Sequence, residues 1–182
     1  AQVASYLDRP NRFCVNMPDF DSVFVERERR IYEAVFARFG AVAPDQVDRP
    51  LEADAGYLIS FGLGLGLQIP PLVDAIQMRD LIIVEQFREF LQLSLRVVDW
   101  APVLETLAAR GGRCHFLLGA DAPALSTEIF SLLRGRNFGL IDGSYGIQHY
   151  GSPLLSQVHG LFRQMLPSLG MSDGFFDDEL WM

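Results

Sequence analysis

A glycine-rich turn is the first place in this chain where residue types and spacing indicate chemistry. Gly62, Gly64 and Gly66 follow a short apolar run and precede a helical segment. Such glycines let a backbone approach a ligand closely, and the following helix offers free N–H groups. Glu85 follows Gly66 by about 20 residues, the spacing at which a carboxylate accepts hydrogen bonds from a ribose. The pattern predicts a site for a nucleotide or a nucleoside-containing cofactor.

Other residues around the turn favour a purely structural role. Leu67 stands where the dinucleotide-binding fingerprint has a small residue, and Ser60 stands where S-adenosylmethionine-dependent methyltransferases usually carry an acid. Pro70 and Pro71 remove two N–H donors from the first turn of the helix. A turn that only allows tight packing of strand and helix is therefore an equal alternative.

If the turn binds a ligand, its spacing fits S-adenosylmethionine better than a dinucleotide. On that hypothesis the three glycines line the cofactor, Glu85 holds its ribose and Asp121 lies near its adenine. The chain would then be a methyltransferase-like enzyme, and its cofactor a nucleotide or S-adenosylmethionine. A free-standing interaction domain without a ligand is a third possibility.

A second candidate site is the polar segment that follows the expected fourth strand. Its candidate residues are Asp142, Tyr145, Gln148, His149 and Tyr150. Loops at the carboxyl end of a parallel sheet often carry function, and His149 has the chemistry of a base or a phosphate ligand. The alternative is a glycine-rich turn whose side chains satisfy their own backbone. No nucleophile or paired carboxylate stands at a recognisable spacing, so we predict no catalytic residue.

Composition narrows the class of protein. The net charge of −8 argues against binding nucleic acid through a basic surface. No run of 18 apolar residues is present, which predicts no transmembrane helix. The two cysteines, Cys14 and Cys114, form no C-x-x-C pair, and the three histidines show no metal-ligand spacing. We expect a cytoplasmic protein with reduced thiols and no bound metal.

Alternating periodicities predict an α/β fold. Expected strands cover residues 57–61, 81–84, 114–118 and 138–141. Expected helices run from the glycine turn to about 77, then over 87–98, 99–110, 121–134 and from 152 until Pro167 ends the last one. Strands alternating with helices predict a Rossmann-like, three-layer domain with a mostly parallel sheet and helices on both faces.

We expect three parts along the chain. Residues 1–56 form a helical lead-in, whose first twenty residues show no period and whose helix starts at Asp21 and runs to position 38 or 39. Residues 57–170 form the Rossmann-like domain. Residues 171–182 are a tail whose four large apolar side chains would dock on this domain, a partner or a missing downstream domain: Phe175, Phe176, Leu180 and Trp181.

The order of these landmarks resembles the N-terminal domain of the motility-associated-factor (Maf) family of flagellin glycosyltransferases. The resemblance covers roughly residues 15 to 180. Its pieces are residues 61–66 (FGLGLG), 81–85 (LIIVE) with Phe87 and Phe90, 98–100 (VDW), 116–119 with Asp121, 142–145 (DGSY), 148–150 (QHY) with Ser152, and 174–179 (GFFDDE).

The resemblance implies a division of labour within a longer bacterial protein. Family members are thought to transfer a nonulosonic acid from a CMP-activated sugar to serine or threonine of flagellin. That chemistry is assigned to a central domain beyond the GFFDDE segment, so no catalytic residue of the family maps onto this chain. The implied partners are a downstream catalytic domain of the same protein and flagellin, with a non-catalytic role for this module.

Overall fold

The structure is a computed structural model that describes residues 2–8, 11–13, 54–136, 141 and 143–171. The expected helix from Asp21, the region around 137–140 and the apolar tail lie outside the described residues.

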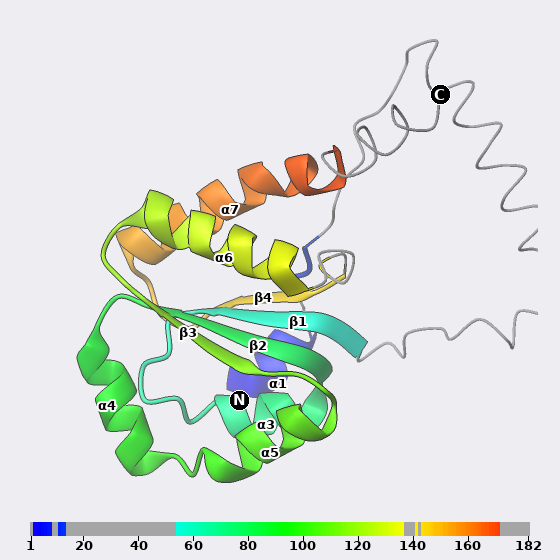
Figure 1. The fold of residues 1–182 in the computed structure, drawn as a ribbon. Coiled ribbons are helices and arrows are strands. Elements are labelled where there is room, and N and C mark those ends of the chain that lie inside the picture. Colours follow the sequence, from blue (N-terminus) through cyan, green and yellow to red (C-terminus); the bar gives the residue numbers. More distant parts are fainter. Residues whose placement is uncertain (1, 9–10, 14–53, 137–140, 142, 172–182) are drawn as a thin grey trace, which may run out of the picture. The chain divides into compact units, whose positions relative to one another are not determined.

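A four-stranded, all-parallel sheet forms the centre of the described fold (Figure 1). Its strands are β1 (Asp54–Phe61), β2 (Gln77–Glu85), β3 (Cys114–Leu118) and β4 (Tyr145–Gln148), in the spatial order β3-β2-β1-β4. In register, Leu58 of β1 lies opposite Leu81 of β2 and Tyr145 of β4. The α/β class and the parallel sheet are confirmed.

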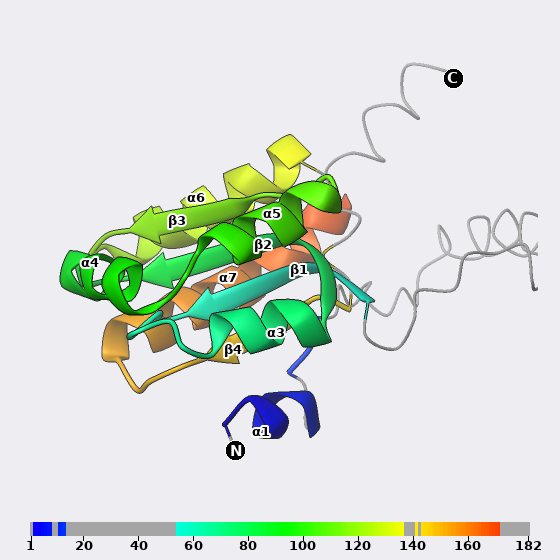
Figure 2. The same ribbon diagram turned by 90° about the horizontal axis from the view of Figure 1, so that it is seen from below.

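Helices cover both faces of the sheet, as Figures 1 and 2 show. On one face lie α1 (Gln2–Asp8), α3 (Ile69–Ala75), α4 (Arg88–Val97) and α5 (Ala101–Ala109). On the other lie α6 (Ala122–Arg136) and α7 (Pro153–Met171). Asp121 Oδ1 accepts a hydrogen bond from Ala124 N and caps α6 as predicted. The start of α5 lies slightly later than expected, because its N-cap is Trp100, and Asp99 Oδ1 accepts a hydrogen bond from Ala101 N just before it.

Strand alternation divides the apolar side chains between two cores. Tyr57, Ile59 and Phe61 of β1 pack with α6 and α7, whereas Leu58 of the same strand packs with α3 and α5. Successive strand residues point to opposite faces, so a continuous apolar run fills both layers. This pattern explains why β1 and β2 lack the polar alternation of a half-exposed sheet.

The fourth strand of the sheet lies at Tyr145–Gln148, within the segment expected to be a loop. Of the strand expected at 138–141, residues 138–140 lie outside the described residues and Ile141 is not in a strand. The strand is only four residues long and contains Gly146, whose Cα lies so close to the Phe13 ring that a Cβ would come within 2.7 Å of it. Pairing with β1 and packing against Phe13, both distant in sequence, therefore determine this strand.

The N-terminal residues also differ from the prediction of an irregular segment. Residues 2–8 form α1, because Val3 and Tyr6 pack against the core beneath the sheet. Phe13 N donates to Ser144 O, and Gly146 N donates to Asn11 O, each at 2.8 Å. Residues 11–13 thus cover the outer edge of β4, which would otherwise expose unpaired backbone groups.

Two helix ends differ by smaller amounts. The helix after the glycine turn ends at Ala75, because β2 begins at Gln77, earlier than the apolar run suggests. Pro167 does not end the last helix, which continues to Met171. A proline removes one i→i−4 hydrogen bond, and here a single further turn follows it.

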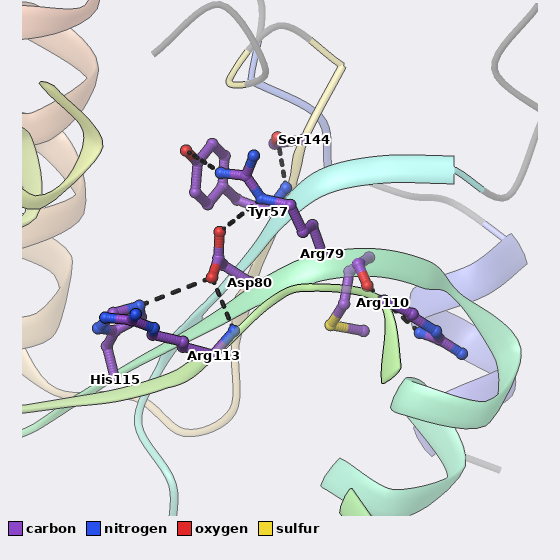
Figure 3. A network of polar contacts seen from close by, with 8 residues as sticks. Tyr57, Arg79, Asp80, Arg110, Arg113, His115 and Ser144 are labelled. Carbon is purple, nitrogen blue, oxygen red and sulfur yellow. Dashed lines mark hydrogen bonds and ion pairs between the residues drawn. The ribbon is translucent and has the colours of Figure 1, made fainter. Parts of the chain in front are cut away.

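A buried carboxylate joins the strands near their amino ends (Figure 3). Asp80 is fully buried, and its Oδ2 accepts a hydrogen bond from Arg79 Nε while its Oδ1 accepts one from Arg113 N, both at 2.8 Å. Arg79 Nη2 also donates to Tyr57 Oη at 3.2 Å, and His115 Nε2 lies 3.7 Å from Asp80 Oδ1. Asp80 therefore links β1, β2 and β3.

We expect Asp80→Ala to lower the free energy of unfolding by about 2 kcal/mol, because it leaves the Arg113 N–H without its acceptor and Arg79 without its ion pair. Urea denaturation followed by circular dichroism measures the change. Asp74→Ala, on the exposed side of α3, is the control and should change stability by less than about 0.5 kcal/mol. Equal midpoints for the two variants would contradict this role of Asp80.

Candidate functional site

The glycine turn joins β1 to α3 at the carboxyl edge of the sheet. Gly62, Gly64 and Gly66 have φ values of 94°, 55° and 77°, a region that residues with a Cβ rarely adopt. Gly62 N donates to Val84 O at 2.8 Å, and Gly66 N donates to Leu63 O at 3.0 Å. The turn is thus bonded to itself and to β2.

Glu85 ends β2 directly beside the turn and is fully buried. Its Oε2 accepts hydrogen bonds from Leu63 N at 2.8 Å and from Gly64 N at 3.4 Å. Its Oε1 accepts from Gln86 N at 2.8 Å, from Phe87 N at 3.0 Å and from the hydroxyl of Tyr150 at 2.5 Å. An ionised carboxylate offers about four lone-pair sites, so this one has its full complement of donors from the protein.

This geometry bears directly on the predicted cofactor role. A ribose hydroxyl could bond to Glu85 only by displacing a protein donor from a carboxylate that has no exposed surface. Breaking a charge-assisted hydrogen bond in a buried site costs about 1.5–3 kcal/mol. The structure therefore favours the packing interpretation of the turn.

The protein's own side chains also lie close against the turn. A Cβ on Gly62 would lie 2.6 Å from Tyr150 Cε1, and one on Gly64 would lie 2.9 Å from His149 Nε2. Both aromatic side chains come from the connection between β4 and α7. The space that glycines leave open for a cofactor in other α/β proteins is filled here.

Ser94, on α4, lies against the third glycine. A Cβ on Gly66 would lie 2.3 Å from Ser94 Oγ, and Ser94 is the one buried residue of α4. Its hydroxyl accepts a hydrogen bond from Trp100 Nε1 at 3.2 Å. The contact holds α4 against the turn through a small polar residue.

The β4–α7 connection is itself fixed in place. His149 N donates to Phe61 O at 3.0 Å, and Ser152 Oγ donates to Gln86 Oε1 at 3.1 Å. Gln148 Nε2 donates to Ser156 Oγ, also at 3.0 Å. These bonds join the connection to the ends of β1 and β2 and to α7.

The structure gathers some predicted residues and separates others. The three glycines, Glu85, His149 and Tyr150 lie together, whereas Gln148 and Tyr145 belong to β4. Tyr145 is buried near the N-terminal segment, where its hydroxyl accepts a hydrogen bond from Arg12 Nη2.

The two remaining aspartates that the sequence singled out are not part of this cluster. Asp121 caps α6, and Asp142 lies outside the described residues. Ligand binding by the predicted set stays a prediction.

Neither the contact of Ser94 with Gly66 nor the hydrogen bond between Tyr150 and Glu85 could be predicted from the sequence. The only sequence signal for the second was the polar segment at 148–150, and no local pattern indicates that it would contact the end of β2.

Two titratable groups of the cluster have pKa values shifted from their usual range. Burial lowers the pKa of His149 below its usual value, although the charge of Glu85 partly opposes this. Burial raises the pKa of Tyr150, and its hydrogen bond to Glu85 raises it further. Both shifts favour the uncharged form, so at neutral pH the cluster contains a neutral imidazole and a neutral phenol.

Burial raises the pKa of Cys114 to about 12, so its sulfur remains a thiol rather than a nucleophilic thiolate. Within the described residues, no three of the His, Cys, Asp and Glu side chains are grouped as metal ligands. None of the described helices has the length and apolar character needed to cross a bilayer.

Comparison with known proteins identifies the family. Residues 1–171 match the family described as the glycosyltransferase Maf N-terminal domain. The chain therefore belongs to that family, which confirms the resemblance noted in its motifs. No curated protein matches the chain significantly.

A solved structure shares the fold. It is a Maf glycosyltransferase from Magnetospirillum magneticum AMB-1, with 24% sequence identity and a TM-score of 0.73. The match covers 98% of this chain and 28% of that protein, so this chain spans little more than a quarter of its length.

We expect Gly62→Ala to lower the free energy of unfolding by about 2 kcal/mol, because alanine is strained at this φ and its Cβ would collide with Tyr150. Gly160→Ala is the matched control, since this helical glycine in α7 has no atom within 4 Å of a built Cβ. It should be neutral or stabilising by up to about 1 kcal/mol. Thermal or urea unfolding distinguishes them, and an unaffected Gly62→Ala would show that the turn is not closely covered.

Proposed function

We propose that this chain is the non-catalytic N-terminal module of a bacterial, cytoplasmic glycosyltransferase that modifies flagellin. The complete enzyme would transfer a nonulosonic acid from its CMP-activated form to serine or threonine. Membership of the Maf N-terminal domain family supports the parent activity. The module would serve a downstream catalytic domain and contribute to recognition of flagellin.

The saturated carboxylate of Glu85 carries the non-catalytic part of this proposal. Five protein donors occupy its two oxygens, and Tyr150 and His149 cover the turn beside it. A nucleotide site in this fold needs an acceptor for the ribose and open space above the glycines. This chain uses both for its own packing.

A methyltransferase function is not favoured. Ser60, at the position of the usual acid, is fully buried, and its hydroxyl donates to Gly62 O at 2.8 Å. Asp121, the expected adenine neighbour, uses Oδ1 to cap α6. Each residue that would distinguish this cofactor has a structural partner.

Calorimetric titration tests the proposal. S-adenosylmethionine, NAD and CMP, each added to millimolar concentration, should give no saturable heat with this chain. The chain alone should also transfer no sugar to flagellin from a CMP-activated nonulosonic acid, whereas the full-length polypeptide should. Saturable binding of S-adenosylmethionine, or transfer by the chain alone, would contradict the proposal.

A further inference from the structure

Exposed apolar side chains concentrate at one edge of the described fold. Of its eight exposed large hydrophobic residues, six lie in the glycine turn or in and just before α4. They are Leu65, Leu67, Phe87, Leu93, Leu95 and Val97, which we call the carboxyl-edge surface. Leu67 is 62% exposed and Leu95 is 60% exposed. Single exposed leucines are ordinary, whereas several large apolar side chains exposed on two neighbouring segments indicate an interaction site.

The helix α4 is the main contributor. Its inner face carries buried Ser94 with the partly buried Phe90 and Leu91, which contact Tyr150 and the core. Leu93, Leu95 and Val97 stay exposed on the flanks of the helix. Figure 2 shows α4 at the end of the sheet toward which the strands point. The close contact between Ser94 and Gly66 brings the helix and the glycine turn together, so the two exposed segments are neighbours.

The carboxyl-edge surface lies beyond the carboxyl ends of the strands, where parallel α/β sheets usually bind their ligands. Here Tyr150 and His149 fill that position, and the surrounding turn and helix present leucines instead of polar groups. The exposed charges of α4 (Arg88, Glu89 and Arg96) border the apolar side chains. An apolar centre with a polar rim is the composition of a protein–protein interface.

We infer that the carboxyl-edge surface docks the glycosyltransferase domain of the same polypeptide. This inference rests on the proposed function. The Maf glycosyltransferase that shares the fold devotes only 28% of its chain to the matched part, so most of such a protein lies outside this unit. Covalent linkage gives an attached domain an effective concentration in the millimolar range, at which a small apolar surface suffices for docking. A second copy has no such advantage.

Hydrogen–deuterium exchange tests the docking. Amides of residues 87–97 should exchange at least about tenfold more slowly in the full-length polypeptide than in this 182-residue chain, since docking suppresses local opening. Leu95→Glu and, independently, Leu67→Ser should return that segment to the faster rate in the full-length polypeptide. Leu7→Glu, at a 37% exposed leucine of α1 outside the surface, is the matched control and should leave the protection intact.

Each result decides the inference. Equal exchange in the two polypeptides, or protection that survives both variants, would overturn it. Sedimentation equilibrium of the 182-residue chain should show a monomer. A dimer that dissociates in Leu95→Glu would assign the surface to a second copy and also overturn the inference. Equal exchange combined with sugar transfer by the full-length polypeptide would reject the docking while leaving the proposed function standing.

Discussion

The carboxylate of Glu85 is the interaction on which the rest of this edge of the fold depends. It receives backbone N–H groups from the glycine turn and from the end of its own strand, together with the hydroxyl of Tyr150. A buried charge is tolerable only when such donors replace its water. Because the donors come from three separate segments, satisfying this one charge fixes the shape of the turn and the position of the β4–α7 connection.

The same constraint explains how the protein's own groups come to cover the glycine turn. The donors that satisfy Glu85 include the amides of the turn, and the residue that completes its shell also covers Gly62. Structural use and ligand binding therefore compete for the same groups. Once the polar edge is closed in this way, exposed leucines on the turn and on α4 make it suitable for another protein surface.

Local sequence accounts for much of the architecture. The apolar runs of β1, β2 and β3 and the aspartates at the starts of α5 and α6 are signals that do not need tertiary context. The fourth strand could not be found this way, because its residues are mixed in polarity and its pairing partners lie far away along the chain. The role of Glu85 was hidden for the same reason. Its spacing from the glycines is that of a ribose ligand, and its decisive partner, Tyr150, lies 65 residues away.

The stability of a Glu85→Gln variant tests this account most directly. The substitution keeps the side-chain volume but removes the charge and turns an amide N–H₂ toward backbone donors, so we predict a loss of about 3 kcal/mol in the free energy of unfolding. Glu89→Gln, at an exposed position on α4, should change it by less than about 0.5 kcal/mol. A Glu85→Gln variant as stable as the parent chain is what a ligand-facing carboxylate would give, and it would contradict the structural role assigned to this residue.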